Sequence, residues 1–364
     1  MKCHFVYSVP VVNKSLIQRI NRKIRVILNE ASLPVALITN RQPDEKEIDQ
    51  WPGQSPYSNT KNIYKALSKV YPTQLYTLKE HVKIRFNDDD IFLGHPFFPY
   101  KPNGIGVTEF AVSSKVKPKV LAIITPLHCD INIKTTHINK AFLDHVNGLM
   151  PKVDVLFAIM GQYWWDQWDQ SPYAHWKSKM VRLDMAVDVK DYRLIKKNFN
   201  KPGHRKFLYI GKNDPMKGVD FLSKLAFELK NCEFGWIGVG EDIPGVKRIS
   251  GPRQLDPEYM SKVAEDYDFF ISPSLADPNP TTILESMAWG FPVICTPQSG
   301  YYETEYIRNI YRNDFNKSVE IIKSLQDLNE IELFKWSKLA RQVVEDEYNW
   351  ERFTDTILKH IASF

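Results

Sequence analysis

The stretch Ser272–Gly300, SPSLADPNPTTILESMAWGFPVICTPQSG, carries the most detailed structural information in this sequence. Its centre predicts a helix that opens at Asn279-Pro280 and ends at Gly290, because Asn is a preferred N-cap, Pro suits the first helical position and Gly is the preferred stop. An apolar strand is expected on each side, over Phe269–Ser272 and Pro292–Thr296. The stretch therefore predicts a strand–loop–helix–strand unit, which is the repeating element of α/β proteins.

Two carboxylates lie around the start of this helix. Asp277 is in the loop before it, and Glu285 follows in the second helical turn. The N-terminus of a helix at the carboxyl end of a strand offers free N–H groups and the positive end of the helix dipole, so it attracts anions. An anion site flanked by carboxylates suits a ligand with both phosphates and neighbouring hydroxyls, and a nucleotide sugar is such a ligand.

As a motif, Asp277-x7-Glu285 within PSLADPNPTTILESMAWGFPVICT resembles the Glu-x7-Glu signature of retaining glycosyltransferases with the GT-B fold, the group 1 or family 4-like enzymes. The chain departs from that signature in two places. Its first carboxylate is Asp, which is shorter by a methylene, and Asn279-Pro280 replaces Phe-Gly. The resemblance implies transfer of a sugar from a nucleotide-diphosphate donor to a glycan, lipid-linked or other acceptor, with retention at the anomeric carbon.

The resemblance also implies roles for individual residues of this segment. Asp277 is expected to bind hydroxyls of the donor sugar, and Glu285 is expected to bind the ribose hydroxyls. The amides around Thr281 and Thr282, together with Asn279 at the predicted helix start, are expected to face phosphate or sugar oxygens.

A second motif, Tyr209–Phe221 (YIGKNDPMKGVDF), resembles the family's G-R-x4-K-G. Gly211, Lys212 and Lys217 align with its glycine, arginine and lysine. By this resemblance Lys217 meets the diphosphate and stabilises the negative charge that develops on the leaving group. Lys212 replaces an arginine, so a bidentate contact is lost. Arg253 lies where the family's loop backbone meets the nucleotide base, which is a weak signal.

Two histidines of the first half follow predicted strands. His128 resembles the histidine of the family's T-x-H, which lies near the donor sugar, although two residues rather than one separate it from Thr125. His95 has the corresponding place after the preceding strand. Ligands of parallel sheets bind beyond the carboxyl ends of the strands, so His128 is expected to be catalytic with Lys217 and Asp277, and His95 to lie nearby. A hydrogen-bonded loop histidine is the alternative for each.

Strand and helix patterns alternate along the chain, which predicts two Rossmann-like, doubly wound parallel-sheet domains that face a central cleft. Residues 1–190 are expected to bind the acceptor and residues 203–345 the nucleotide sugar. Tyr348–Glu351 resembles the family's F-S-W-E, so residues 346–364 are expected to form a helix that crosses back to the first domain. The predicted strands of the first domain are Lys2–Ser8, Pro34–Thr39, Gln74–Thr77, Asp90–Gly94, Val120–Thr125 and Val153–Ile159, and helices are predicted over Lys14–Glu30, Val219–Lys230 and Pro257–Ala264.

Charge is distributed unevenly between the two halves. Residues 1–190 hold 25 Lys and Arg against 17 Asp and Glu, whereas the whole chain carries a net charge of only +5. The excess favours an anionic acceptor for the first half, such as a lipid-linked glycan, a polysaccharide or, less favoured, DNA. A solvated surface of ordinary lysine content explains the same counts, so the sequence leaves the acceptor open.

Composition limits the remaining choices. The four cysteines lie far apart and fit buried strands better than a metal site. Asp88–Asp90 precedes a strand and is expected to be its polar entry, so we expect neither a metal nor a cofactor. The N-terminus does not read as a signal peptide, and long apolar runs are missing. We expect a cytoplasmic protein and leave open a peripheral contact with the inner face of a membrane.

An aromatic segment and two other functions stay open at this point. Tyr163–Trp176 packs four Trp and two Tyr into fourteen residues. It predicts either a platform that stacks on the acceptor or a local hydrophobic plug. The replacements at Asp277, Lys212 and Asn279 also suit a non-catalytic partner that binds sugar nucleotides in a glycan assembly system. A sugar-nucleotide epimerase of the GT-B fold is a further alternative.

Overall fold

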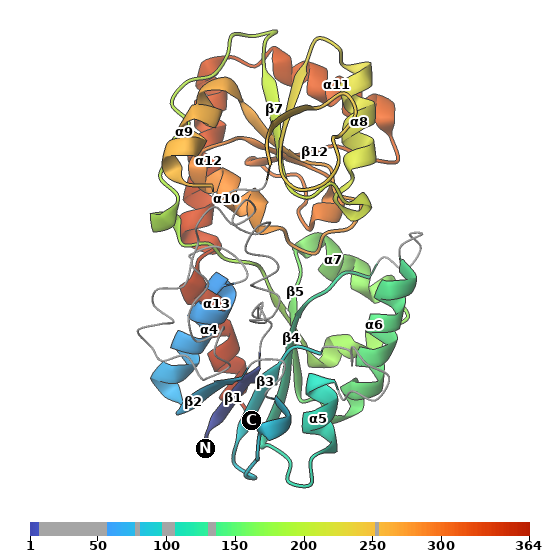
Figure 1. Cartoon of the computed structure of the whole chain (residues 1–364), viewed down its shortest axis with the longest axis vertical. Coiled ribbons are helices and arrows are strands. Elements are labelled where there is room, and N and C mark those ends of the chain that lie inside the picture. Colours follow the sequence, from blue (N-terminus) through green and yellow to red (C-terminus); the bar gives the residue numbers. More distant parts are fainter. Residues whose placement is uncertain (7–56, 77–80, 97–105, 130–135, 252–254) are drawn as a thin grey trace, which may run out of the picture.

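The computed structural model describes residues 1–6, 57–76, 81–96, 106–129, 136–251 and 255–364. Two α/β domains stack along the long axis of the molecule, and each is built on a six-stranded parallel sheet (Figure 1). The predicted strand Pro34–Thr39 and the predicted helix Lys14–Glu30 lie outside the described residues. Within the described part of the chain, no helix combines the length and the apolar character that a bilayer crossing needs.

The first sheet has the strand order β2-β1-β3-β4-β5-β6. Its strands are β1 Cys3–Val6, β2 Thr73–Tyr76, β3 Ile91–Gly94, β4 Val120–Pro126, β5 Val155–Ile159 and β6 Met180–Leu183. The central strands are buried on both faces, as the near-continuous apolar run of β4 shows. Successive side chains therefore enter opposite cores, with Ile123 packed on one side of the sheet and Ile124 on the other.

Helices cover both faces of this sheet. One face carries α5 and α6, with Leu143 of α6 in its core, and the other carries α4 and the last helix of the chain, α13 (Trp350–Ile361). The helices of this domain are α4 Tyr57–Val70, α5 Val107–Ser113, α6 Thr136–Leu149 and α7 Gln162–Gln167. Short 3-10 turns lie at His81–Lys83, Met150–Lys152, Trp168–Gln170, Ala174–Lys179 and Val189–Asp191.

The second sheet has the strand order β12-β11-β10-β7-β8-β9. Its strands are β7 Lys206–Ile210, β8 Glu233–Ile237, β9 Lys247–Ser250, β10 Phe269–Ser272, β11 Val293–Cys295 and β12 Ile307–Asn309. Its helices are α8 Val219–Glu228, α9 Pro257–Asp266, α10 Thr281–Trp289, α11 Phe315–Gln326 and α12 Glu330–Glu347, with 3-10 turns at Pro215–Lys217 and Pro297–Ser299. Phe207 of β7 stacks between Phe234 and Phe269 on the face that α8 and α11 cover.

The predicted fold class is confirmed, because both domains are doubly wound parallel sheets. The predicted strands that fall on described residues are present with small changes at their ends. Strand β6, at the edge of the first sheet, was not predicted. Its short run Met180–Leu183 is interrupted by the partly exposed Arg182, so its hydrophobic pattern is weak.

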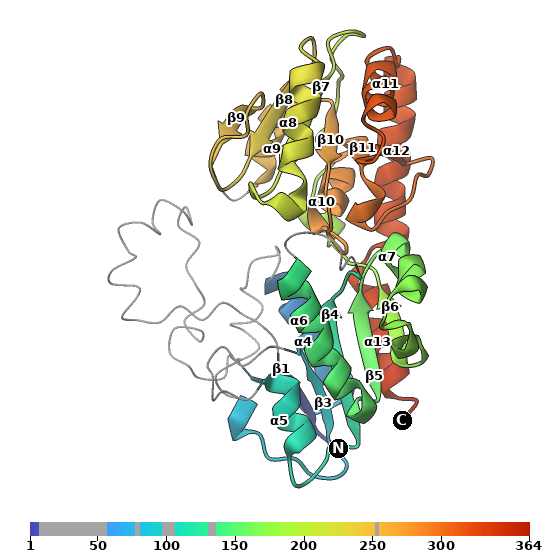
Figure 2. The same ribbon diagram turned by 90° about the vertical axis from the view of Figure 1, so that its right-hand side faces the viewer.

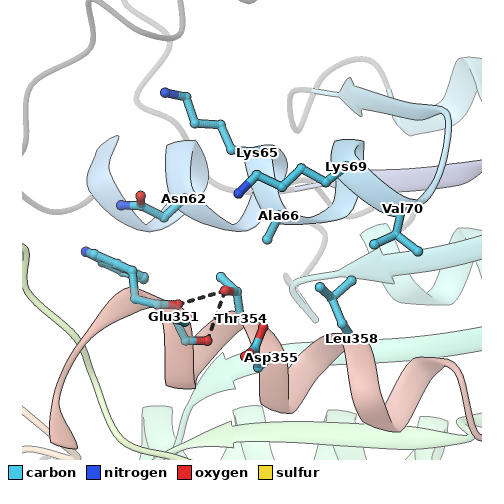
Figure 3. A pocket seen from close by; sticks show the side chains of 10 residues that line it. Asn62, Lys65, Ala66, Lys69, Val70, Glu351, Thr354, Asp355 and Leu358 are labelled. Carbon is cyan, nitrogen blue, oxygen red and sulfur yellow. Dashed lines mark hydrogen bonds between the residues drawn. The ribbon is translucent and has the colours of Figure 1, made fainter. Parts of the chain in front are cut away.

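The chain returns to the first domain at its end. Helix α13 (Trp350–Ile361) runs beside α4, and both views place it on the first sheet (Figures 1 and 2). Its buried residues Phe353 and Ile357 belong to an apolar cluster that also includes Phe157 of β5 and Val293 of β11. One continuous core therefore joins the two domains. A groove between α4 and α13, with Lys65 and Lys69 on one wall, opens on the outer surface (Figure 3).

Candidate active site

The loop between β10 and α10 holds the first predicted carboxylate, and its local structure differs from the prediction in one respect. Helix α10 begins at Thr281, and Pro280 is its N-cap, without a side-chain capping bond. The prediction that Asn279 caps the helix is wrong. Its side-chain Oδ1 instead accepts a hydrogen bond from the backbone N–H of Met185, at 2.6 Å, so this side chain serves a contact between domains. The predicted stop is confirmed, since Gly290 is left-handed with a φ of 88°.

Lys217 and Asp277 meet at the start of this loop. The ammonium of Lys217 forms an ion pair with Oδ2 of Asp277, although sixty residues separate them along the chain. Asp277 is 7% exposed, whereas the Lys217 side chain is partly open to solvent. A buried carboxylate requires a partner that offsets its lost hydration, and the lysine supplies it. The charged pair therefore joins the turn before α8 to the loop that leads into α10.

A tight turn positions Lys217. The side chain of Asp214 accepts from the N–H of Met216, at 2.8 Å, and the turn ends at Gly218, whose φ is 73°. A Cβ at Gly218 would lie 1.8 Å from the carbonyl oxygen of Pro273. The carbonyl of Met216 also accepts from the N–H of Leu275, at 2.9 Å. The lysine turn and the aspartate loop therefore fold against each other, and only glycine fits between them.

Glu285 is held by a tyrosine from the segment that connects the domains. The hydroxyl of Tyr192 donates to its Oε1, at 3.2 Å. Burial raises the pKa of Glu285 to about 7, and this hydrogen bond acts in the opposite direction. The ring of Tyr192 packs on Trp289, with 5.3 Å between the ring centroids. A ligand hydroxyl that reaches Glu285 would share the carboxylate with Tyr192.

Gly211 and Lys212 follow β7 at the same edge of the sheet. The carbonyl of Gly211 accepts from the indole N–H of Trp236, at 2.9 Å, and its N–H donates to Ile237, at 3.0 Å. Lys212 is exposed, and its carbonyl accepts from the hydroxyl of Tyr209, at 2.8 Å. Lys212 therefore lies at the carboxyl end of the sheet, as does the α10 loop, with its side chain toward solvent.

The two histidines of the first domain have different surroundings. His128 follows β4, is partly buried and packs its ring 5.4 Å from the ring of Trp164. His95 follows β3, and its Nε2 lies 3.0 Å from the hydroxyl of Thr125. Burial lowers the pKa of His95 to about 3, so its imidazole is neutral at physiological pH. Arg253 lies outside the described residues.

The aromatic segment is mainly a hydrophobic plug. Trp164, Trp168 and Trp176 are each at most 2% exposed and belong to the core under the first sheet. Trp164 has a second role that was not predicted: its indole N–H donates to the carbonyls of Asp277 and Gln298, both at 3.0 Å. Buried Trp N–H groups need an acceptor, but the sequence does not reveal that the acceptor lies in the other domain.

The aspartate run Asp88–Asp90 leads into strand β3, and its last residue forms structural hydrogen bonds. Asp90 is buried, accepts from the backbone N–H groups of Lys2 and Asn87 at 3.0 and 2.8 Å, and lies 3.0 Å from Nε2 of His4. These bonds tie β1 to the start of β3. Among the described residues, no group of three or more His, Cys, Asp or Glu is placed to hold a metal ion.

Comparisons with known proteins give a consistent result. Residues 204–322 match the family model described as glycosyl transferases group 1. No curated protein sequence matches the chain. Among solved structures, TarM is similar with a TM-score of 0.57 and 15% identity, over 82% of this chain and 57% of TarM. A mutant of TarM from S. aureus is also matched, and that structure holds Fondaparinux, α-GlcNAc-glycerol and UDP.

Two other solved structures match over almost their whole length. WaaG, a glycosyltransferase involved in lipopolysaccharide biosynthesis, has a TM-score of 0.55 and 12% identity over 84% of this chain and 96% of WaaG. OtsA in its apo form has a TM-score of 0.58 and 10% identity over 99% of each chain. This chain therefore shares the two-domain GT-B fold of these glycosyltransferase structures, and residues 204–322 of its second domain match the group 1 glycosyl transferase family model.

Proposed function

We propose that this protein transfers a glycosyl group from a nucleotide-diphosphate sugar to an acceptor hydroxyl. The second domain binds the donor and the first domain binds the acceptor. In the net reaction, the bond between the anomeric carbon and the diphosphate oxygen breaks, the acceptor oxygen bonds to that carbon, and the acceptor proton leaves with the diphosphate. The similarity of the second domain to the group 1 family over residues 204–322 supports this reaction class.

One observation carries the proposal: Lys217 forms an ion pair with Asp277 in the loop that leads into α10. A leaving diphosphate gains negative charge in the transition state, and fixed positive groups lower the energy of that state. Lys217 and the first amides of α10 provide such groups without a metal ion. Binding of the diphosphate would compete with Asp277 for the ammonium and free this carboxylate to accept hydrogen bonds from the donor sugar.

The remaining roles follow from position. Glu285 accepts hydrogen bonds from the ribose hydroxyls, beside Tyr192. His128 follows β4 of the first sheet, and its ring contacts Trp164, which bonds the loop between β10 and α10, here called the donor loop. The UDP held by a TarM mutant supports a uridine or related nucleotide. We propose an anionic glycan acceptor, on a lipid carrier or in a polysaccharide, because the first half of the chain is basic. We further propose that the anomeric configuration of the donor is retained.

The first experiment is a thermal-shift screen of the purified protein against UDP-, GDP-, ADP- and dTDP-sugars, because a ligand that binds the folded state raises its melting temperature. The donor that gives a shift is then incubated, in labelled form, with lipid-linked and polysaccharide acceptors. We expect labelled product with the anomer of the donor. A protein that binds none of these sugars, and transfers none, would refute the proposal.

A second candidate, a non-catalytic sugar-nucleotide-binding partner, is favoured by one observation. Both carboxylates of the motif already have partners in the chain, Lys217 for Asp277 and Tyr192 for Glu285. Such a protein would give a thermal shift but no product with any acceptor and no hydrolysis of the donor. Analysis of the recovered donor would also expose an epimerase, which returns an altered sugar.

A further inference from the structure

The donor loop of the second domain and the turn that follows β11 accept hydrogen bonds from the first domain. The N–H of Gly161 donates to the carbonyl of Pro278, at 2.8 Å, and the N–H of Tyr163 donates to the carbonyl of Gly300, at 3.3 Å. The two backbones approach closely, since a Cβ on Gly161 would lie 2.0 Å from the carbonyl oxygen of Gly300. Strand β5 and helix α7 of the first domain therefore meet the loop that carries Asp277 (Figure 1).

Trp164 lies at the centre of this contact. Its indole N–H lies between two carbonyl acceptors, those of Asp277 and Gln298, at 3.0 Å each. The N–H of Asp277 donates to the same carbonyl of Gln298, at 2.9 Å. The indole is 2% exposed, and its ring contacts the ring of His128. One side chain therefore touches both a first-domain histidine and the backbone of the second-domain aspartate.

The sequence of the donor loop explains why it accepts hydrogen bonds from the first domain. Pro278 and Pro280 have no backbone N–H, so neither residue can donate a backbone hydrogen bond within the loop. The carbonyls of Asp277 and Pro278 are bonded by Trp164 and Gly161 of the first domain. The orientation of the Asn279 side chain is likewise fixed by the N–H of Met185. Residues of the first domain thus help to fix the backbone at Asp277, whereas Lys217 of the second domain holds its carboxylate.

We propose that Trp164 is a positioning residue for the transfer step: its indole fixes the backbone of Asp277 and holds His128 against the donor loop. This inference rests on the proposed function, because it assigns Trp164 to the site that binds the donor sugar. Asp277 faces the sugar and not the nucleotide in that function. A displaced Asp277 therefore slows transfer while binding of the free nucleotide diphosphate is retained.

The test compares Trp164→Phe with Trp165→Phe as the matched control. Phe at 164 keeps an aromatic ring beside His128 but cannot donate to the two carbonyls. Trp165 is adjacent on α7 and partly exposed, and the ammonium of Lys177 lies over its ring.

We expect Trp164→Phe to lower kcat by about 10- to 100-fold, the order expected for a small misplacement of a reacting group. Its Kd for the free nucleoside diphosphate, measured by calorimetry, should change by less than about 3-fold. Trp165→Phe should leave both quantities unchanged.

A double-mutant cycle with Asp277→Asn separates positioning from simple loss of stability. If Trp164 acts through Asp277, the fold-change caused by Trp164→Phe should shrink in the Asp277→Asn background, because coupled residues are not additive. Equal fold-changes in both backgrounds would overturn the inference, and so would a kcat for Trp164→Phe equal to that of Trp165→Phe. If Trp164→Phe does not fold, Trp164→Leu, which also cannot donate to the two carbonyls, takes its place in the cycle. A wild-type protein without transfer would refute the proposed function itself, which is a different result.

Discussion

At the scale of single residues, Lys217 forms an ion pair with Asp277, in the loop that leads into α10. We expect Lys217→Ala to lower kcat by about 100-fold or more, which is the order observed when one electrostatic stabiliser of a transition state is removed. Lys224→Ala is the matched control, because Lys224 lies on the exposed side of the neighbouring helix α8. Steady-state transfer rates check this prediction, and equal rates for the two variants would contradict it.

Glu285 gives a prediction about pH. Burial raises the pKa of its carboxyl to about 7, whereas the ordinary pKa of glutamate in an unfolded chain is 4.5. Between these values the folded state binds more protons, so the stability contributed by the neutral carboxyl is present at low pH and is lost as the pH rises toward 7. Denaturant unfolding at a series of pH values should show this loss in the wild type but not in Glu285→Gln. The expected difference between the two proteins is about 1–2 kcal/mol, because one pKa unit corresponds to about 1.4 kcal/mol and the residue is partly exposed.

At this scale the sequence predicted residue types better than partners. The ion pair of Lys217 and Asp277 joins the two sequence motifs. Asn is a preferred N-cap residue, but Pro280 is the N-cap of α10. The Asn279 side chain instead accepts a hydrogen bond from the N–H of Met185. An interaction between residues far apart in the chain has no local signature, so it was not predictable.

At the scale of elements, the turn between β7 and α8 depends on Gly218. We expect Gly218→Ala to lower the free energy of unfolding by at least about 2 kcal/mol, because it adds a steric clash to the cost of a left-handed φ. Gly203 separates these two effects. It has a similar φ of 80°, compared with 73° for Gly218, but nothing lies within 4 Å of an added Cβ. Gly203→Ala should cost only about 1 kcal/mol.

Denaturant unfolding of both variants measures this difference. Similar losses for Gly203→Ala and Gly218→Ala would show that the close approach to Pro273 does not matter. Donor affinity adds a second measure, since Lys217 precedes Gly218 and should move with it. The sequence identifies this segment through its resemblance to G-R-x4-K-G, but the oxygen of Pro273 that demands the glycine is visible only in the structure.

At the scale of the whole molecule, the alternation of strands and helices was enough to predict two parallel-sheet domains. The contact between the domains was not predictable, because it is made by backbone groups of Gly161, Pro278 and Gly300 and by an indole in an aromatic segment of ambiguous purpose. Backbone donors and acceptors leave no trace in composition. The resemblance covers the second domain well and the first domain poorly.

The contact between the domains leads to one prediction at this scale. Gly161 has an ordinary φ of −72°, so alanine is compatible with its backbone, but its Cβ would meet the carbonyl of Gly300. We expect Gly161→Ala to separate the domains slightly, raise the radius of gyration in small-angle X-ray scattering and lower kcat/KM by about 10- to 100-fold. Gly148→Ala, inside α6 with nothing near the added Cβ, should change neither quantity. An unchanged radius and rate for Gly161→Ala would show that the interdomain contact is adaptable.

The central claim is that the diphosphate of a sugar donor binds between Lys217 and the N-terminus of α10. Its most direct test is a crystal structure of the protein with the donor found in the thermal-shift screen. We predict phosphate oxygens within hydrogen-bonding distance of the Lys217 ammonium and of the amides at Thr281 and Thr282, with the sugar beside Asp277. A donor bound elsewhere, with the ion pair of Lys217 and Asp277 intact and the start of α10 covered by side chains, would contradict the account.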